Sequence, residues 1–202
     1  MPVIDITLVQ GLLVAICGYF LGSIPFGMVL AKIMGLGNLR DIGSGNIGAT
    51  NVLRTGNKTA AFLTLVFDAG KGAIAVVLAR VLFGDVAAQI AGLAAFLGHL
   101  FPVWLQFNGG KGVATFLGIL FALALPGAVA ACMTWLAVAV VGRISSLSAL
   151  IASLFTPIWC FVFGHTNMIA LTVVLAALIW WSHRDNIVRI LARTEPSFRK
   201  KN

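Results

Sequence analysis

The chain has 202 residues, of which 60% are hydrophobic and only 10% are charged, and its mean hydropathy is +1.02. A soluble domain of this length could not bury so much apolar surface, so the composition excludes an ordinary soluble enzyme and predicts an all-α integral membrane protein. The formal charge of +8 would suggest nucleic-acid binding in a soluble protein. In a membrane protein, basic residues instead gather in cytoplasmic loops and set the orientation, so we expect no nucleic-acid partner.

The first apolar run covers about residues 6–30 and follows MPVID, which contains no basic residue. Lys32 and Arg40 come after the run, so it does not read as a signal peptide, and the charge asymmetry places the N-terminus outside. Within the run, GSIPFG (22–27) contains glycine and proline, which can bend a helix near its cytoplasmic end.

Further membrane spans are predicted at about 59–84, 86–106, 146–163 and 167–182. The intervening apolar stretch, 113–141, is long for a single helix and has Pro126 and Gly127 near its midpoint. Splitting it there gives seven transmembrane helices, some of them short, and places the basic C-terminus in the cytoplasm with nearly all other Lys and Arg residues. A five-span arrangement is the alternative.

The stretch FNGGKGVATF (107–116) places a lysine among glycines, as phosphate-binding loops do. The nucleotide-binding pattern GxxxxGK[ST] would need glycine at 105 and Ser or Thr at 112, but the chain has Leu105 and Gly112, so we expect no nucleotide. Backbone N–H groups beside Lys111, just before a predicted helix start near Val113, would still suit an anion. A tight interfacial turn with a snorkelling lysine is an equally open interpretation.

The stretch GSGNIGATN (43–51) contains the pattern GxGxxG, which is typical of dinucleotide-binding folds when it follows a soluble strand. Here it follows a membrane span, and Asp68, at the spacing of a ribose ligand, lies inside the next apolar run. The dinucleotide interpretation is therefore rejected. Hydroxyls, amides and a guanidinium still suit a phosphate, and a flexible loop is the alternative. These groups belong to Ser44, Asn46, Thr50, Asn51 and Arg54.

The stretch HRDN (183–186) resembles part of a kinase catalytic loop, but that pattern needs an asparagine where the chain has Ile190. On a helix, His183, Asn186 and Arg189 would share one face. The alternative is a basic helix end that lies on anionic lipid. That alternative explains best the residues Arg189, Arg193, Arg199, Lys200 and Lys201.

Asp68 and Lys71 stand three residues apart at membrane depth, where a charge is tolerable mainly as part of a pair, so we expect a structural ion pair. His99 could be a core histidine, a base or a residue that orients others. The cysteines lie in apolar runs without metal-binding spacing, so they predict neither a disulfide framework nor a metal site. They are Cys17, Cys132 and Cys160.

Five stretches carry a resemblance to a known family: GSIPFG (22–27), GSGNIGATN (43–51), DAGKG (68–72), GHLFPVWLQFNGGKGVAT (98–115) and HRDNIVRIL (183–191). In order and spacing they closely resemble the acyl-phosphate-dependent glycerol-3-phosphate acyltransferases, the PlsY family, over nearly the whole chain. The resemblance implies a multi-pass enzyme of the bacterial cytoplasmic (inner) membrane, with one domain spanning 1–202 and a cytoplasmic active site. It would transfer the acyl group of a fatty acyl phosphate to the C1 hydroxyl of glycerol 3-phosphate. The products would be 1-acyl-glycerol 3-phosphate (lysophosphatidic acid) and inorganic phosphate, in phospholipid biosynthesis.

The resemblance also assigns roles to residues, with no cofactor, metal or nucleotide expected. The catalytic residues would be Ser44, Arg54, Lys111, His183 and Asn186. The substrate-binding residues would be Gly43, Gly45, Asn46, Gly48, Thr50, Asn51, Gly109, Gly110, Ser146 and Arg184. The supporting residues would be Asp68, Lys71 and His99. The alternatives are a membrane transporter of a small phosphate ester, which should show polar groups near the midplane, and another lipid-phosphate transferase.

Overall fold

A computed structural model describes residues 6–197, and across that range all regular secondary structure is helical. The all-α prediction is confirmed for these residues. The chain divides between Leu123 and Ala124 into two compact units, and each is described by itself. The basic tail residues Arg199, Lys200 and Lys201 lie outside the described residues.

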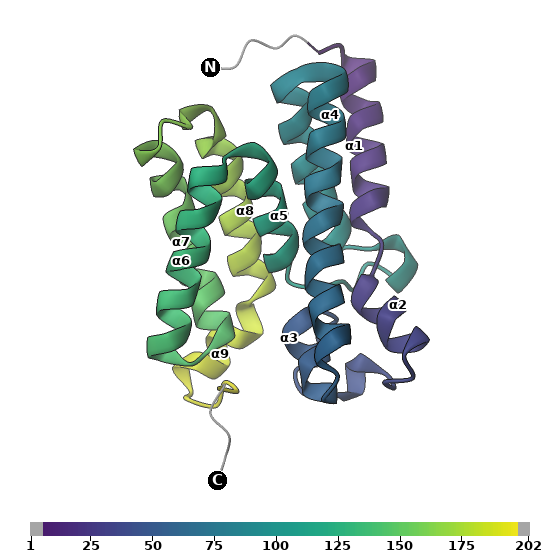
Figure 1. The fold of residues 1–202 in the computed structure, drawn as a ribbon, viewed down its shortest axis with the longest axis vertical. Helices are drawn as coiled ribbons and strands as arrows, with labels where there is room; N and C mark the ends of the chain where they lie inside the picture. Colours follow the sequence, from purple (N-terminus) through teal and green to yellow (C-terminus); the bar gives the residue numbers. More distant parts are fainter. Residues whose placement is uncertain (1–5, 198–202) are drawn as a thin grey trace. The chain divides into compact units, whose positions relative to one another are not determined.

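The first unit begins with two helices separated by the predicted break. The N-terminus of the first helix is closed by a capping box between Thr7 and Gln10, and the break falls at residues 23–25, inside GSIPFG. The elements of this unit are α1 (Leu8–Gly22), α2 (Phe26–Ile33), η1 (Leu39–Asp41), α3 (Ala49–Val52), η2 (Leu53–Thr55), α4 (Lys58–Leu100), η3 (Val103–Leu105) and α5 (Val113–Leu123), and Figure 1 shows α1 alongside α4.

The element α4 is a helical hairpin with two legs. At Gly84 the backbone leaves the helical region, with φ 84° and ψ −171°, a conformation that favours glycine. In a straight helix, residues 68 and 99 would be about 46 Å apart, yet Asp68 Oδ1 and His99 Nδ1 are 3.7 Å apart. The legs therefore run antiparallel, as the separate predictions for 59–84 and 86–106 required, although the helical part of the second leg ends at Leu100.

The second unit contains α6 (Leu125–Gly142), α7 (Ser145–Val162), η4 (Thr166–Met168), α8 (Ile169–Ser182) and α9 (Arg184–Leu191). The predicted split of the long apolar stretch is confirmed, but its place at Pro126 and Gly127 is wrong. The break is at Ala124 (φ −149°, ψ 77°), and Pro126 stands in the first turn of α6. A proline is tolerated there because its missing N–H would have no partner within the helix anyway.

Both units expose large apolar side chains on their outer faces. Leu8 is 79% exposed, Val81 77% and Val141 86%. Water would disfavour such surfaces, whereas lipid tails accept them. The outer faces therefore fit a bilayer.

Within the described residues, four helices are long and apolar enough to cross a membrane, judged by length and composition. This count treats α1 and α2 together as one helix, and it likewise treats both legs of α4 together with η3 as one helix. The four are Leu8–Ile33, Lys58–Leu105, Leu125–Gly142 and Ser145–Val162. The pair Thr166–Ser182 and Arg184–Leu191, bent by 62°, would make a fifth, and Val113–Leu123 is a shorter apolar helix.

Candidate functional site

The predicted loop 43–54 is organised around one buried amide. Asn51 is 1% exposed, and its Nδ2 donates to the carbonyl oxygens of Leu39 (3.0 Å) and Asn46 (2.7 Å). Its Oδ1 accepts from the Ser44 N–H (3.0 Å), the Ser44 hydroxyl (3.3 Å) and Arg54 Nη1 (3.3 Å). The structure therefore brings Ser44 and Arg54 together through Asn51, with both of their side chains at the exposed surface of the loop.

Arg40, which was not among the predicted site residues, connects this loop to the lysine-containing loop. Its Nη1 donates to the Gly45 carbonyl oxygen (3.0 Å) and its Nη2 to the Asn108 carbonyl oxygen. A guanidinium can hold two acceptors in a fixed geometry because its donors form a rigid fork. Loops 43–54 and 107–112 are therefore neighbours within the first unit.

The loop 107–112 rests on the last turn of α4. The Gly109 N–H donates to the Leu100 carbonyl oxygen (3.0 Å) and the Gly110 N–H to the His99 carbonyl oxygen (3.1 Å). These bonds satisfy carbonyls that a helix end would otherwise leave without partners. Two of the predicted anion-binding N–H groups are thus used inside the fold, while Lys111 stands half-buried just before α5.

Asp68, Lys71 and His99 form a buried polar cluster beneath that loop. Lys71 Nζ is 2.8 Å from Asp68 Oδ1, which confirms the expected ion pair, and it donates to the Ile24 carbonyl oxygen at 2.8 Å. His99 is 4% exposed. A Cβ added to Gly110 would collide with Nε2 of its ring and would lie 3.0 Å from Cε1 and 3.2 Å from Cδ2. The histidine therefore lies directly against the glycine-rich loop.

In the second unit, His183 is buried at the junction of α8 and α9. Its Nδ1 lies 2.8 Å from the Ile179 carbonyl oxygen and 3.3 Å from the Ser182 hydroxyl. A carbonyl can only accept, so this contact assigns the proton of the neutral ring to Nδ1 and makes Nε2 the basic nitrogen. In this tautomer, Nε2 of His183, a predicted catalytic residue, can accept a proton.

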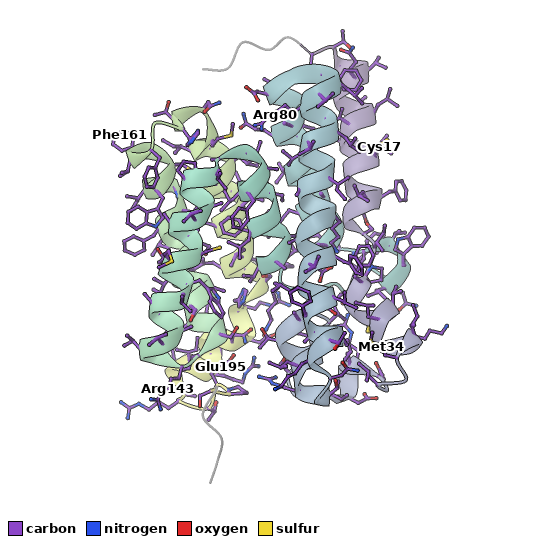
Figure 2. The ribbon with its side chains drawn as sticks, in the orientation of Figure 1. Cys17, Met34, Arg80, Arg143, Phe161 and Glu195 are labelled. Carbon is purple, nitrogen blue, oxygen red and sulfur yellow. The ribbon has the colours of Figure 1, made fainter. Side chains whose placement is uncertain are left out.

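Glu195 gathers two predicted site residues in the second unit and was not itself predicted. Its Oε1 accepts from the Ser146 hydroxyl (2.7 Å) and Asn186 Nδ2 (2.5 Å), and its Oε2 pairs with Arg189 Nε (2.7 Å). Burial alone would raise the pKa of Glu195, but the hydrogen bonds from Asn186, Ser146 and Arg189 and the charge of Arg189 together lower it. Figure 2 shows Glu195 and Arg143 at one end of this unit and Phe161 at the other.

Other predicted residues have simpler surroundings. The Arg184 guanidinium lies 4.8 Å from the centre of the Trp181 ring, over its face. Asn46 Oδ1 accepts from the Ile47 N–H (2.9 Å), and Gly48 precedes the first residue of α3. Arg184 and Thr50 are exposed.

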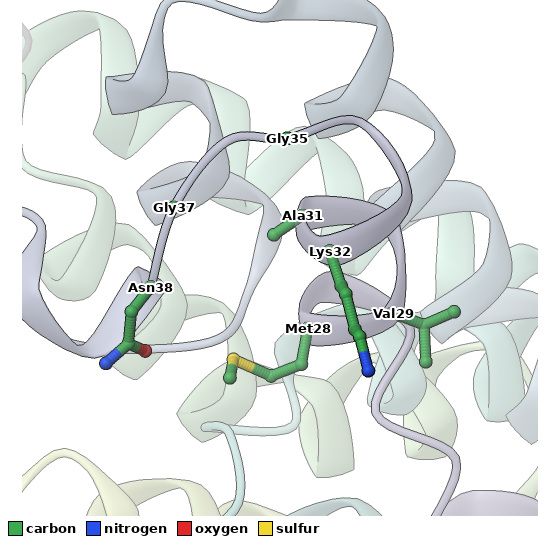
Figure 3. A pocket seen from close by; sticks show the side chains of 7 residues that line it. All are labelled: Met28, Val29, Ala31, Lys32, Gly35, Gly37 and Asn38. Atoms are coloured by element: carbon green, nitrogen blue, oxygen red, sulfur yellow. The ribbon is translucent and has the colours of Figure 1, made fainter.

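A pocket of about 520 Å³ opens beside α2 and the turn that follows it (Figure 3). The polar side chains in its lining are Lys32 and Asn38, and the lining as a whole is mainly apolar. Its residues are Met28, Val29, Ala31, Lys32, Gly35, Gly37 and Asn38, none of which was predicted as a site residue.

The family model described as "Glycerol-3-phosphate acyltransferase" matches residues 12–193. The chain belongs to the glycerol-3-phosphate acyltransferase family. A relative of that name from Dinoroseobacter shibae is 61% identical over 194 residues, covering 95% of this chain and 96% of the relative. Another, from Roseobacter denitrificans, is 60% identical over 198 residues, covering 98% and 99%.

Two crystal structures of PlsY, an integral membrane glycerol 3-phosphate acyltransferase, share the fold. The glycerol 3-phosphate form has a TM-score of 0.89 and 40% identity, covering 94% of this chain and 96% of that one. The lysophosphatidic acid form has a TM-score of 0.85 and 38% identity, covering 94% and 95%. With the apolar outer helices, this similarity identifies a multi-pass membrane protein and confirms the resemblance to the PlsY family.

Sequence reasoning missed Arg40 and Glu195 for different reasons. Arg40 precedes the glycine-rich loop by a few residues, and its position in the sequence indicates only a charge that sets the orientation in the membrane. Glu195 is the single glutamate of the chain and stands in a basic segment. That local reversal of charge was a signal, because an isolated acid among basic residues often has a specific partner.

Proposed function

We propose that the protein transfers the acyl group of a fatty acyl phosphate to the C1 hydroxyl of glycerol 3-phosphate. The observation that carries the proposal is the pair of loops joined by Arg40, which combine glycine-rich backbone with exposed Arg54 and half-buried Lys111 in a chain of this family. One substrate is a small dianion from water, and the other has a tail that belongs in lipid. A basic, glycine-rich surface at the end of apolar helices suits both.

The reaction requires little covalent chemistry from the protein. The C1 hydroxyl oxygen attacks the acyl carbonyl carbon, the bond from that carbon to the phosphate oxygen breaks, and inorganic phosphate leaves with the electron pair. Phosphate is a good leaving group, so positioning and electrostatic stabilisation supply most of the catalysis. Ser44 and its loop would hold the acyl phosphate, while Arg54 and Lys111 would hold glycerol 3-phosphate.

The hydroxyl proton needs an acceptor. His99 is buried beneath Gly110, which argues against direct contact with a substrate. A substrate phosphate is the favoured acceptor, and His183 Nε2 is the second candidate because the proton of the neutral ring is on Nδ1. Asn186 and Ser146 stay proposed ligands of glycerol 3-phosphate.

We further propose seven crossing segments in the cytoplasmic membrane of a bacterium, with the active site and C-terminus inside. Counting the two legs of α4 separately and including α5 gives seven apolar helices: α1, the two legs, α5, α6, α7 and α8. The positive charges of the loops support this orientation.

The decisive experiment gives the purified protein acyl phosphate, acyl-CoA or acyl carrier protein thioester, each with glycerol 3-phosphate, and follows lysophosphatidate. Product from a thioester but not from acyl phosphate would overturn the proposed donor, and no product from any donor would favour the transporter. Arg54→Ala and Lys111→Ala should lose far more activity than Arg199→Ala, whose position lies outside the described residues. Equal losses would refute the proposed site.

A further inference from the structure

We propose that His99 is a positioning residue for the glycine-rich loop 107–112, and that the buried pair Asp68 and Lys71 holds it in place. The inference rests on the proposed function, in which this loop presents Lys111 to glycerol 3-phosphate. It assigns a role in substrate affinity to a side chain that lies too deep to touch the substrate.

The loop needs support because its own backbone offers little resistance to movement. It contains Gly109, Gly110 and Gly112, and glycine has more accessible backbone conformations than any other residue. A lysine on such a segment would bind an anion weakly, because binding would have to order the loop first. Some other part of the fold must therefore fix its position.

The last turn of α4 provides that support through backbone and side chain together. The Gly109 and Gly110 N–H groups donate to the carbonyl oxygens of Leu100 and His99. The His99 ring lies against Gly110 so closely that one added carbon would collide with its Nε2. The His99 ring therefore supports the loop at Gly110, the residue just before Lys111.

The His99 ring is in turn held in place by the buried pair Asp68 and Lys71. His99 Nδ1 faces Asp68 Oδ1 at 3.7 Å, and Asp68 is 2.8 Å from Lys71 Nζ. The residues His99, Asp68 and Lys71 are 4%, 2% and 3% exposed respectively, so the electrostatic interactions among them are little screened by solvent. Lys71 is anchored in turn to the Ile24 carbonyl oxygen. Polar groups thus follow one another from the break between α1 and α2 to the lysine-containing loop. The step from Asp68 to His99 is longer than a hydrogen bond, so the carboxylate holds the ring by packing and electrostatics.

The start of α5, on the far side of the loop, is fixed by the same segment of α4. The Thr115 hydroxyl donates to the Asp68 carbonyl oxygen at 2.9 Å. Asp68 therefore contributes to both ends of the segment that carries Lys111: its carboxylate faces His99, and its backbone holds the first turn of α5. A helix-packing role alone would not require this convergence beneath one loop.

The test is a double-mutant cycle between His99 and Gly110. In the wild-type background, Gly110→Ala should lower kcat/KM for glycerol 3-phosphate about 30-fold or more, because the new methyl group meets the ring. In a His99→Asn background, the smaller side chain makes room, and the same change should cost less than about three-fold. The matched control is Gly70→Ala, where an added Cβ meets nothing within 4 Å, and it should leave kinetics unchanged.

The kinetic pattern of the single variant separates positioning from simple destabilisation. His99→Asn should raise KM for glycerol 3-phosphate about ten-fold while changing KM for acyl phosphate less than two-fold. If it is not recovered folded, His99→Gln takes its place in the cycle, because a flexible amide can bend away from the added methyl group. Losses that simply multiply in the double variant, or an equal rise in both KM values, would overturn the inference. Failure of the proposed donor would instead be visible in the wild-type protein, and the cycle could be run with whichever donor is used.

Discussion

Replacing Glu195 with glutamine tests whether one carboxylate holds the predicted residues of the second unit in place. The side chain of Glu195 is 7% exposed and accepts from Ser146, Asn186 and Arg189. A hydrogen bond to a charged group contributes about 1.5–3 kcal/mol, against about 0.5–1.5 kcal/mol for a neutral one. Glutamine also places an NH₂ group where one set of donors now points.

The expected loss is about 2–3 kcal/mol of stability. The three bonds would lose about 1 kcal/mol each, and the Arg189 contribution is discounted because that side chain is 37% exposed. At about 2–4 °C per kcal/mol for a chain of this size, the melting temperature should fall by roughly 5–10 °C. Activity should fall about ten-fold, since the shared acceptor of Ser146 and Asn186 would lose its charge and one of its two oxygens.

The stability lost in Glu195→Gln should depend on pH. The pKa of Glu195 is lowered in the folded protein, so its contribution to stability is present above the ordinary glutamate value of about 4.3 and disappears as the pH falls through the lowered value. The difference in melting temperature between wild type and Glu195→Gln should therefore be largest near neutral pH and shrink below about pH 4.

The assay is tryptophan-fluorescence melting of detergent-purified protein across this pH range, with lysophosphatidate formation measured in parallel. Asp185→Asn is the matched control, because it removes an exposed carboxylate from the first turn of α9, and a surface change of this kind shifts stability by about 0.5 kcal/mol or less. An unchanged melting temperature in Glu195→Gln, or a difference that does not vary with pH, would refute the reasoning.

Three further tests concern the first unit. Arg40→Gln should lower kcat/KM about ten-fold with little change in melting temperature, because it releases Gly45 and Asn108 at the surface; activity equal to that of Lys58→Gln would contradict this. Asp68→Asn and Lys71→Met should each lower the stability of the fold by about 3–5 kcal/mol, because each leaves a buried charge without its partner. The double variant should recover most of this loss. Folded yield in detergent measures the effect. A double variant less stable than either single one would refute the pairing argument. Gly118→Ala should lower the melting temperature, because its methyl group would collide with the Ala69 carbonyl oxygen, while Gly70→Ala meets nothing within 4 Å; equal melting temperatures for the two would count against the packing shown.

The breaks between helices were predictable because glycine, proline and the charge bias mark them in the sequence. GSIPFG and Gly84 interrupt the helices where the hydropathy pattern places them. The distribution of positive charge predicts that the stretch 113–141 is split, but Pro126 and Gly127 place the split about two residues beyond the observed break at Ala124. Proline restricts the residue before it and removes one donor, but the first turn of a helix tolerates both effects.

The partners within the site were less predictable, because they depend on how distant segments meet. No local pattern indicates that the Gly109 and Gly110 N–H groups cap α4. Nor does any pattern indicate that the Asn51 amide donates to the carbonyl oxygens of Leu39 and Asn46. The residue types alone favoured direct contacts with phosphate. The N–H groups of Gly109, Gly110 and the Asn51 side chain instead have acceptors within the protein.

The predicted ligands of the first unit therefore fall into two groups, those bonded within the fold and those with exposed side chains. Polar groups that water cannot reach must find partners within the fold, and Asn51, Gly109 and Gly110 make such bonds. Substitutions at these three positions should therefore act through loop geometry. Ser44 and Arg54 keep exposed side chains at the loop surface, where a phosphate can reach them without breaking the fold. Loss of substrate affinity without loss of stability is accordingly expected at Ser44 and Arg54, and loss of both together at Asn51.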